Sequence, residues 1–218
     1  MSRIGIMGGT FNPVHNGHLH IASAAYTQYG LDEIWFMPNH IAAYKSRQSM
    51  IRTSDRVAMI QLAIQNIPYF TLNTMEIVRG GRTYTADTLR ILHDEHPKHN
   101  YYFIIGADSL ESFPRWYHPI EILRYAEILV ASRGSVDEDK VQALIHETES
   151  ELHVLDRFHI LPCHDASEPR LSTTWVASSR IRECIINGLD TEPMTGQRLS
   201  DMLPMSVLQY IYDHNLYA

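Results

Sequence analysis

The sequence predicts a doubly wound α/β fold with a mainly parallel sheet. Short apolar runs alternate with stretches of helical periodicity, and the connections between the runs are long enough for right-handed crossovers. Two of the apolar runs end in glycine followed by polar residues. A sheet of this kind binds its ligand beyond the carboxyl ends of its strands, so we expect the functional residues to follow those runs.

Strands and helices alternate in the first half of the chain. We expect strands at residues 3–7, 33–37 and 70–73, with a further strand candidate at 75–78 before the Gly80-Gly81 turn. Helices are expected at residues 17–30 with Asn16 as the cap, from Thr53 or Ser54 through residue 67, and at 85–93. A polar loop is expected at residues 39–52.

The second half continues this alternation and then becomes helical. We expect strands at residues 101–105, 127–132 and 159–162, a short helix that opens at Pro119, and an exposed amphipathic helix at 137–148. The tail, about 178–218, is expected to be helical, with Ser178 capping one helix and Pro204 opening the last. We expect residues 1–218 to form a single domain.

Composition limits the class of protein. The chain has 218 residues, of which 44% are hydrophobic and 20% are charged, which suits a domain with a sizeable core. Its formal net charge of −7 argues against a broad nucleic-acid surface. Cys163 and Cys184 show no pairing signature, and no apolar stretch is long enough to cross a membrane. We therefore expect a cytoplasmic protein with free thiols and neither a nucleic-acid nor a membrane partner.

The stretch GGTFNPVHNGHL, residues 8–19, follows the first expected strand. Gly8 and Gly9 allow a ligand to approach the backbone closely, because no Cβ stands in the way. His15 and His18 lie on either side of the expected helix start, so both rings can face an anion bound at the helix amino terminus. The stretch has neither the G-x-G-x-x-G of dinucleotide binding nor the Gly-Lys-Ser/Thr of a P-loop. It predicts a phosphate site of another kind.

A second anion-binding motif, VASSRIR, occupies residues 176–182. Backbone N–H groups at the helix start, the hydroxyls of Ser178 and Ser179 and the guanidinium of Arg182 can converge on one anion. Taken alone, this motif fits an ordinary capped helix equally well.

Both motifs resemble nucleotidyltransferase signatures. Residues 9–18 match (T/G)-x-F-x-P-x-H-x-G-H, and residues 176–182 resemble the I-S-S-T-x-I-R of adenylyltransferases. Further stretches at 32–39, 83–85, 103–108 and 116–117 resemble the bacterial nicotinate-nucleotide adenylyltransferases, with 135–172 the least similar part. The resemblance implies a Rossmann-like nucleotidyltransferase fold and a role in NAD biosynthesis.

The implied reaction joins ATP and nicotinate mononucleotide to give deamido-NAD and pyrophosphate. The mononucleotide phosphate attacks the α-phosphate of ATP in line, which needs positioning and charge neutralisation rather than a protein nucleophile. The implied partners are these two substrates, with Mg²⁺ held mainly by ATP phosphates and water and with no protein metal ligands. A homo-oligomer is left open.

The resemblance also implies roles for individual residues. His15 and His18 are the expected catalytic contacts, as hydrogen-bond donors to phosphate. The expected ATP-binding residues are Gly8, Gly9, Thr10, Phe11, Gly106, Asp108, Ser178, Ser179 and Arg182. The expected nicotinate mononucleotide-binding residues are Asn39, Lys45, Tyr84, Thr85, Trp116 and Arg133.

Three departures from the family pattern stand out. The sequence has Ala42-Ala43-Tyr44-Lys45 where the family has P-P-H-K, Ala177 at the first Ser of I-S-S-T, and Arg133-Gly134 without the intervening proline of R-P-G. Tyr44 replaces a histidine on the acceptor side, which leaves that contact open. The other two changes are compatible with the motif chemistry.

The fold also suits two other functions. One is a related nucleotidyltransferase that acts on phosphopantetheine or a phosphorylated alcohol, and the other is a non-catalytic adenine-nucleotide sensor. The presence of both histidines and of the 178–182 motif speaks against a sensor. An aminoacyl-tRNA synthetase is excluded, because the chain holds no K-M-S-K-S loop and no anticodon domain.

Overall fold

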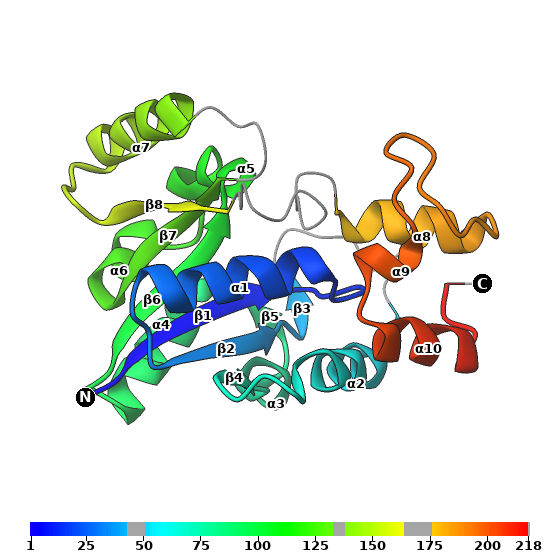
Figure 1. Cartoon of the computed structure of the whole chain (residues 1–218). Helices are drawn as coiled ribbons and strands as arrows, with labels where there is room; N and C mark the ends of the chain where they lie inside the picture. The colour runs from blue at the N-terminus through cyan, green and yellow to red at the C-terminus, as the bar shows by residue number, and fades with distance from the viewer. Residues whose placement is uncertain (43–50, 133–137, 164–175, 218) are drawn as a thin grey trace.

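The computed structural model describes residues 1–42, 51–132, 138–163 and 176–217 (Figure 1). Six parallel strands form the main sheet, in the order β4-β2-β1-β6-β7-β8. These strands are β1 (Arg3–Gly9), β2 (Glu33–Pro38), β4 (Phe70–Leu72), β6 (Asn100–Gly106), β7 (Ala126–Ser132) and β8 (Phe158–Pro162). The predicted fold class is confirmed.

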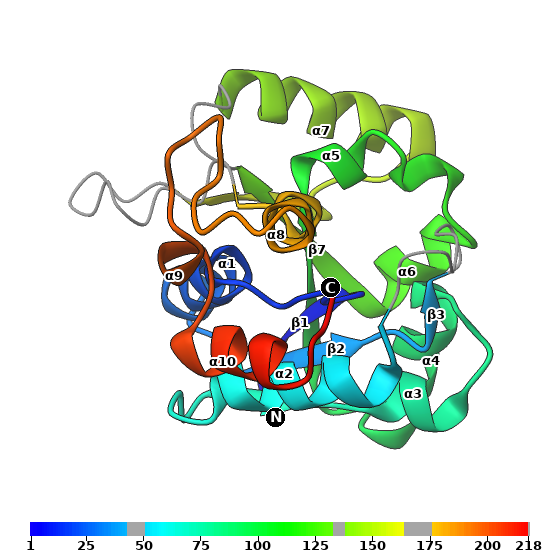
Figure 2. The same ribbon diagram turned by 90° about the vertical axis from the view of Figure 1, so that its right-hand side faces the viewer.

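Helices cover both faces of the sheet. One face packs against α1 (Asn16–Gln28), α2 (Thr53–Ile64), α8 (Ser178–Ile186), α9 (Leu199–Met202) and α10 (Met205–Asp213). The other face packs against α4 (Thr85–Glu95), α5 (Ala107–Leu110), α6 (Pro119–Tyr125), α7 (Glu138–Leu152) and the 3₁₀ turn η2 (Phe113–Arg115). The predicted helical carboxyl-terminal end is present, and α10 lies beside α2 (Figure 2).

The central strands are buried on both faces, as expected for a parallel sheet between two helical layers. In β6, Tyr102 and Ile104 belong to the core under α1, whereas Phe103 and Ile105 belong to the core under α4 and α6. This alternation follows from the two-residue repeat of a strand, and it explains why the run YYFII shows no polar position.

The strand order reverses direction between β1 and β6. From β1 the chain proceeds outward to β2 and β4, and it then returns to add β6, β7 and β8 on the other side of β1. A right-handed crossover on each side of such a switch point leaves a crevice at the carboxyl ends of the two strands. Gly8, Gly9 and Gly106 lie at those ends.

One strand prediction is wrong. Residues 75–78 begin the helix α3 (Met75–Arg79). Asn73 Oδ1 accepts a hydrogen bond from the Met75 backbone N–H at 3.0 Å, which starts a helical turn. The apolar alternation of four residues was too short to distinguish a strand from a helix.

The expected polar loop at 39–52 contains a short strand, β3 (Ile41–Ala42), which pairs with β5 (Arg82–Thr83). The observed helix caps also lie earlier in the chain than the expected ones. His15, Arg52 and Ala177 are the caps of α1, α2 and α8, in place of Asn16, Thr53 or Ser54, and Ser178. The Asn16 side chain instead donates to the Asp201 carbonyl at 2.9 Å. In the described part of the chain no helix is long and apolar enough to cross a membrane.

Candidate active site

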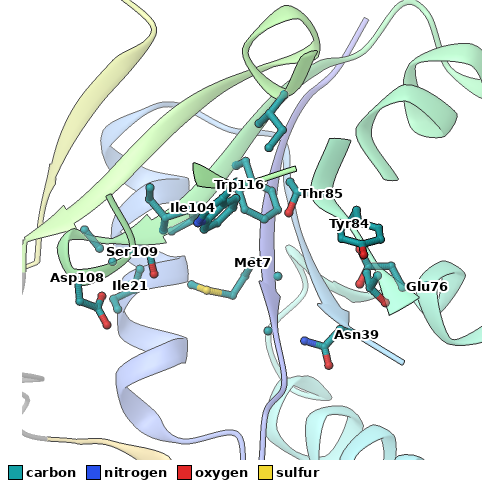
Figure 3. A pocket seen from close by; sticks show the side chains of 18 of the residues that line it. Met7, Ile21, Asn39, Glu76, Tyr84, Thr85, Ile104, Asp108, Ser109 and Trp116 are labelled. Atoms are coloured by element: carbon teal, nitrogen blue, oxygen red, sulfur yellow. The ribbon is translucent and has the colours of Figure 1, made fainter. Parts of the chain in front are cut away.

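A cavity of about 320 Å³ opens at the switch point, beyond the carboxyl ends of β1 and β6 (Figure 3). It is lined by residues from both sides of the sheet and from the turn before α4. Of the predicted site residues, the lining includes Gly8, Gly9, His18, Asn39, Tyr84, Thr85, Gly106, Asp108 and Trp116. Members of both predicted groups of binding residues therefore line one cavity.

Glycine is needed at the end of β1 because the neighbouring rings are close. A Cβ at Gly8 would lie 3.0 Å from Cζ of Phe103, and a Cβ at Gly9 would lie 3.3 Å from the ring of Phe11. Phe11 itself is buried in the core and contacts the rings of His18 and Phe36, so it packs the floor of the loop rather than lining the cavity. Backbone therefore forms this part of the pocket wall.

His15 and His18 take different positions at the start of α1. The His18 ring lines the cavity, whereas His15 is buried and stacks on it with ring centroids 3.7 Å apart. The His15 backbone N–H donates to Nδ1 of His18 at 3.2 Å. When the His18 ring is neutral, its proton is therefore on Nε2, and the ring is a donor at that atom.

The carboxyl-terminal motif contacts the loop between β1 and α1. Ser178 Oγ donates to the Pro13 carbonyl at 2.9 Å, and Arg182 Nη1 donates to the Asn12 carbonyl at 2.8 Å. The structure thus brings residues 178–182 next to residues 8–18, as the two motifs predict. Ser178, Ser179 and Arg182 themselves lie outside the cavity lining, as do Thr10 and His15.

The end of β6 and the start of α5 supply a second part of the wall. Gly106 is the residue before α5, and Asp108 is in the first turn of this helix with an exposed side chain. Gly106 occupies the N-cap position of this helix, so Asp108 is not its cap residue. Its carboxylate is presented to the cavity.

Aromatic side chains form the third wall. Trp116 donates from Nε1 to Ser112 Oγ at 3.1 Å and stands edge-on to Phe103 at 6.5 Å between ring centroids. Tyr84, the residue before α4, packs against Tyr117 at 4.5 Å. These contacts fix the indole and hold one side of it toward the cavity (Figure 3).

Glu76 is a site residue that the sequence interpretation missed. Its carboxyl group lines the cavity but is only 7% exposed, and burial raises its pKa to about 7. Thr88 donates to it at 2.7 Å, and Arg79 donates to the Thr88 hydroxyl at 3.0 Å. The signal was hidden because residues 75–78 were interpreted as a strand, which gives no reason to aim Glu76 at the pocket.

Two polar atoms in the cavity wall have no hydrogen-bond partner among the described residues. They are Oγ1 of Thr83, which was not among the predicted binding residues, and Oδ1 of Asn39. The amide nitrogen of Asn39 is 3.4 Å from Thr10 Oγ1. Buried polar atoms of this kind favour a ligand as the partner. Lys45 and Arg133, and also Tyr44, lie outside the described residues.

Comparison with known proteins agrees with this geometry. Residues 6–183 match the family model described as cytidylyltransferase-like. A probable nicotinate-nucleotide adenylyltransferase of Lachnoclostridium phytofermentans is 37% identical over 217 residues, which cover 100% of both chains. The nicotinate-nucleotide adenylyltransferase of Bacillus subtilis is 45% identical over 133 residues, which cover 61% of this chain and 70% of that protein.

Solved structures show the same fold. Plasmodium falciparum nicotinic acid mononucleotide adenylyltransferase, in complex with NaAD, superposes with a TM-score of 0.73 at 20% identity, and the alignment covers 100% of this chain and 98% of the other. The same protein in complex with APC gives a TM-score of 0.74 at 19% identity, with the same coverage. With a family model that matches residues 6–183 and full-length relatives above 30% identity, the chain belongs to the nicotinate-nucleotide adenylyltransferases of the cytidylyltransferase-like family.

Proposed function

We propose that the protein transfers the adenylyl group of ATP to nicotinate mononucleotide, with release of pyrophosphate, in the cavity at the switch point. The observation that carries this proposal is that one cavity is lined by Gly8, Gly9 and His18 on one side and by Tyr84, Thr85 and Trp116 on another. A phosphate-binding loop and an aromatic acceptor site that share a cavity can hold two substrates in line.

The ATP side uses donors rather than a nucleophile. His18 lines the cavity, and we assign its Nε2 proton to the phosphate oxygens on which negative charge grows during transfer. His15 supports this ring from below. We assign the ribose of ATP to Gly106 and Asp108, and the terminal phosphates to the amino terminus of α8 with Ser178, Ser179 and Arg182.

The acceptor side uses the aromatic wall and the amino terminus of α4. We place the nicotinate ring against Trp116 and its carboxylate toward the backbone N–H groups of the first turn of α4, which begins at Thr85. Asn39 Oδ1 is then an acceptor for a ribose hydroxyl of the mononucleotide, and the Thr83 hydroxyl is a partner for its ribose or its phosphate. Lys45 and Arg133 remain proposed phosphate contacts on sequence grounds alone.

We propose that Mg²⁺ enters as the MgATP complex, with phosphate oxygens and water as its ligands. Among the described residues there is no group of three or more His, Cys, Asp or Glu side chains that could hold a metal, so no protein residue is named as its ligand. When bound, the cation neutralises part of the charge on the departing pyrophosphate. We also propose that residues 1–218 form a single domain and that the protein is cytoplasmic, with a homo-oligomer left open.

The test is a pyrophosphate-release assay with a matrix of substrates. ATP and CTP are each combined with nicotinate mononucleotide, nicotinamide mononucleotide, phosphopantetheine and a phosphorylated alcohol. We expect the highest kcat/KM for ATP with nicotinate mononucleotide, and a product whose mass is that of deamido-NAD. Preference for CTP or for another acceptor would overturn the substrate assignment. ATP binding without turnover on any acceptor would favour the sensor.

A further inference from the structure

The backbone carbonyls of Thr10, Asn12 and Pro13 each accept a hydrogen bond from a side chain in a distant part of the chain. Arg56 Nη1 in α2 donates to the Thr10 carbonyl at 2.7 Å. Arg182 in α8 donates to the Asn12 carbonyl, and Ser178 donates to the Pro13 carbonyl, as described above. Three of the four carbonyls of residues 10–13 therefore accept hydrogen bonds from side chains, which fix this backbone from the side of α2 and α8.

A further donor comes from the segment after α10. Tyr217 donates its hydroxyl proton to Oδ1 of Asn12 at 2.9 Å, across 205 positions of sequence. Asn215 and Tyr217 have φ angles of 49° and 69°, which turn this segment back from α10. The Tyr217 ring packs against the α1 side of the core, and burial raises the pKa of its hydroxyl. Tyr217 is therefore a protonated donor at neutral pH.

Arg56 extends this network to the next strand. Its side chain is 0% exposed, and its Nη2 donates to the Asn39 carbonyl at 2.8 Å. The guanidinium thus joins the loop after β1 to the loop after β2. Among the described residues its acceptors are neutral oxygens, from Thr10, Asn39, His40 and Thr53, so its positive charge remains available to anions bound above the loop.

The network bears directly on His18. The backbone N–H of His15, two residues after Pro13, is the donor that sets Nδ1 of His18 as an acceptor. Displacement of residues 12 and 13 moves this N–H, and with it the direction of the Nε2 proton. A misplacement of about 1 Å can cost a transfer reaction on the order of 10²-fold in rate.

We propose that Tyr217 and Arg56 are positioning residues, which clamp loop 10–13 so that His18 points its proton at the reacting phosphate. The inference rests on the proposed adenylyl transfer for its kinetic consequence. Its structural consequence, the restraint of loop 10–13, does not depend on that reaction, because the hydrogen bonds of the clamp are present without substrate.

The experiment compares Tyr217→Phe with two matched controls. Tyr210→Phe deletes a partly buried hydroxyl in α10, which donates to Asp55 at 3.1 Å. Tyr212→Phe deletes the hydroxyl of an exposed tyrosine in the same helix. Hydrogen exchange of the peptide that spans residues 9–19 is measured without substrate, followed by kcat, both KM values and the melting temperature. Arg56→Lys, which keeps the charge but not the fork, is the second clamp variant.

We expect Tyr217→Phe to raise exchange in residues 9–19 and to lower kcat about tenfold, equivalent to about 1.4 kcal/mol, with both KM values within about twofold. Arg56→Lys should act in the same direction. Tyr210→Phe and Tyr212→Phe should leave exchange of this peptide and kcat unchanged. Unchanged exchange in Tyr217→Phe would overturn the clamp, and raised exchange with unchanged kcat would reduce Tyr217 to a structural role. If wild type released no pyrophosphate with nicotinate mononucleotide, the proposed function would fail, while the exchange arm would still decide on the clamp.

Discussion

At the scale of single residues, the hydrogen bond from the His15 backbone N–H to Nδ1 of His18 determines which nitrogen is the donor. The bond exists because His18 is the third residue of α1, where a side chain can reach back to the N-cap backbone. A His at this position therefore caps its own helix with one ring nitrogen, and the other ring nitrogen is the donor for a ligand. The cap explains the spacing H-x-x-H without contact of both rings with the ligand.

We expect His18→Ala to lower kcat on the order of 10²-fold or more while ATP affinity changes little, because a donor aimed at developing charge acts in the transition state. The matched control is His20→Ala, in the same helix, whose ring contacts the Cys163 carbonyl at 3.1 Å and not the cavity. Steady-state kinetics and ATP titration measure the two effects. A His18→Ala variant within threefold of wild type would remove His18 from the mechanism.

The raised pKa of the buried Glu76 carboxyl predicts that the free energy of unfolding depends on pH. Its pKa in the folded protein is about 7, above the ordinary value of 4.5 that applies when unfolded. The protonated form is favoured by folding, so this contribution is fully present below pH 4.5 and is lost as the pH rises through 7. Glu76→Gln keeps an acceptor for Thr88 but cannot ionise, so its stability relative to wild type should rise with pH, by up to about 3 kcal/mol.

Urea unfolding of wild type and Glu76→Gln at pH 4.5, 6 and 8 measures this difference. Glu95→Gln, an exposed change in α4, is the control and should show little change across the same range. A stability difference between Glu76→Gln and wild type that stays constant with pH would contradict the raised pKa.

At the scale of elements, the amino terminus of α4 decides the expected choice between acid and amide. A nicotinate carboxylate placed on its N–H groups gains charge-assisted hydrogen bonds, whereas the NH₂ of an amide meets other donors. Each such mismatch costs about 1–3 kcal/mol. Glu76 faces the same cavity, and only its protonated form offers the carboxylate a donor.

We therefore expect nicotinate mononucleotide to exceed nicotinamide mononucleotide by about 10² or more in kcat/KM under identical ATP and Mg²⁺. Tyr44→His should leave this ratio nearly unchanged, since the replaced family histidine is assigned to phosphate or ribose contacts. Equal values for the two mononucleotides would indicate a dual-specificity enzyme and would sink the assignment of the α4 terminus.

At the scale of the whole molecule, the two cysteines are components of one core. Cys163 and Cys184 are not bridged to one another, are each 2% exposed and belong to the cluster on the α1 face. Burial raises the pKa of the Cys184 thiol, which keeps it unreactive. We expect mild reductant to change neither activity nor melting temperature. Native and reduced protein should have the same mass, and a difference of two hydrogens with lost stability would show a disulfide.

The sequence by itself determined the parallel α/β fold, the strand–loop–helix at residues 3–28 and the two anion motifs. These features are local, because strand runs, glycine turns and helical periodicity are written in neighbouring residues. The exception is residues 75–78, where four residues fit both periodicities and the Asn73 side chain decided for a helix. Because residues 75–78 were predicted as a strand, the placement of Glu76 in the cavity wall was not predicted.

Only the tertiary structure decided which side chains reach the cavity and which hold it in place. Gly8, His18 and Trp116 line it, but Phe11 and His15 lie beneath it, although all five were predicted to bind substrate or act in catalysis. Contacts such as Tyr217 to Asn12 join residues 205 positions apart, and no sequence periodicity encodes such a pair. The pairing exists because α10 packs on the α1 face of the sheet, where burial of apolar side chains places the following segment against the loop after β1.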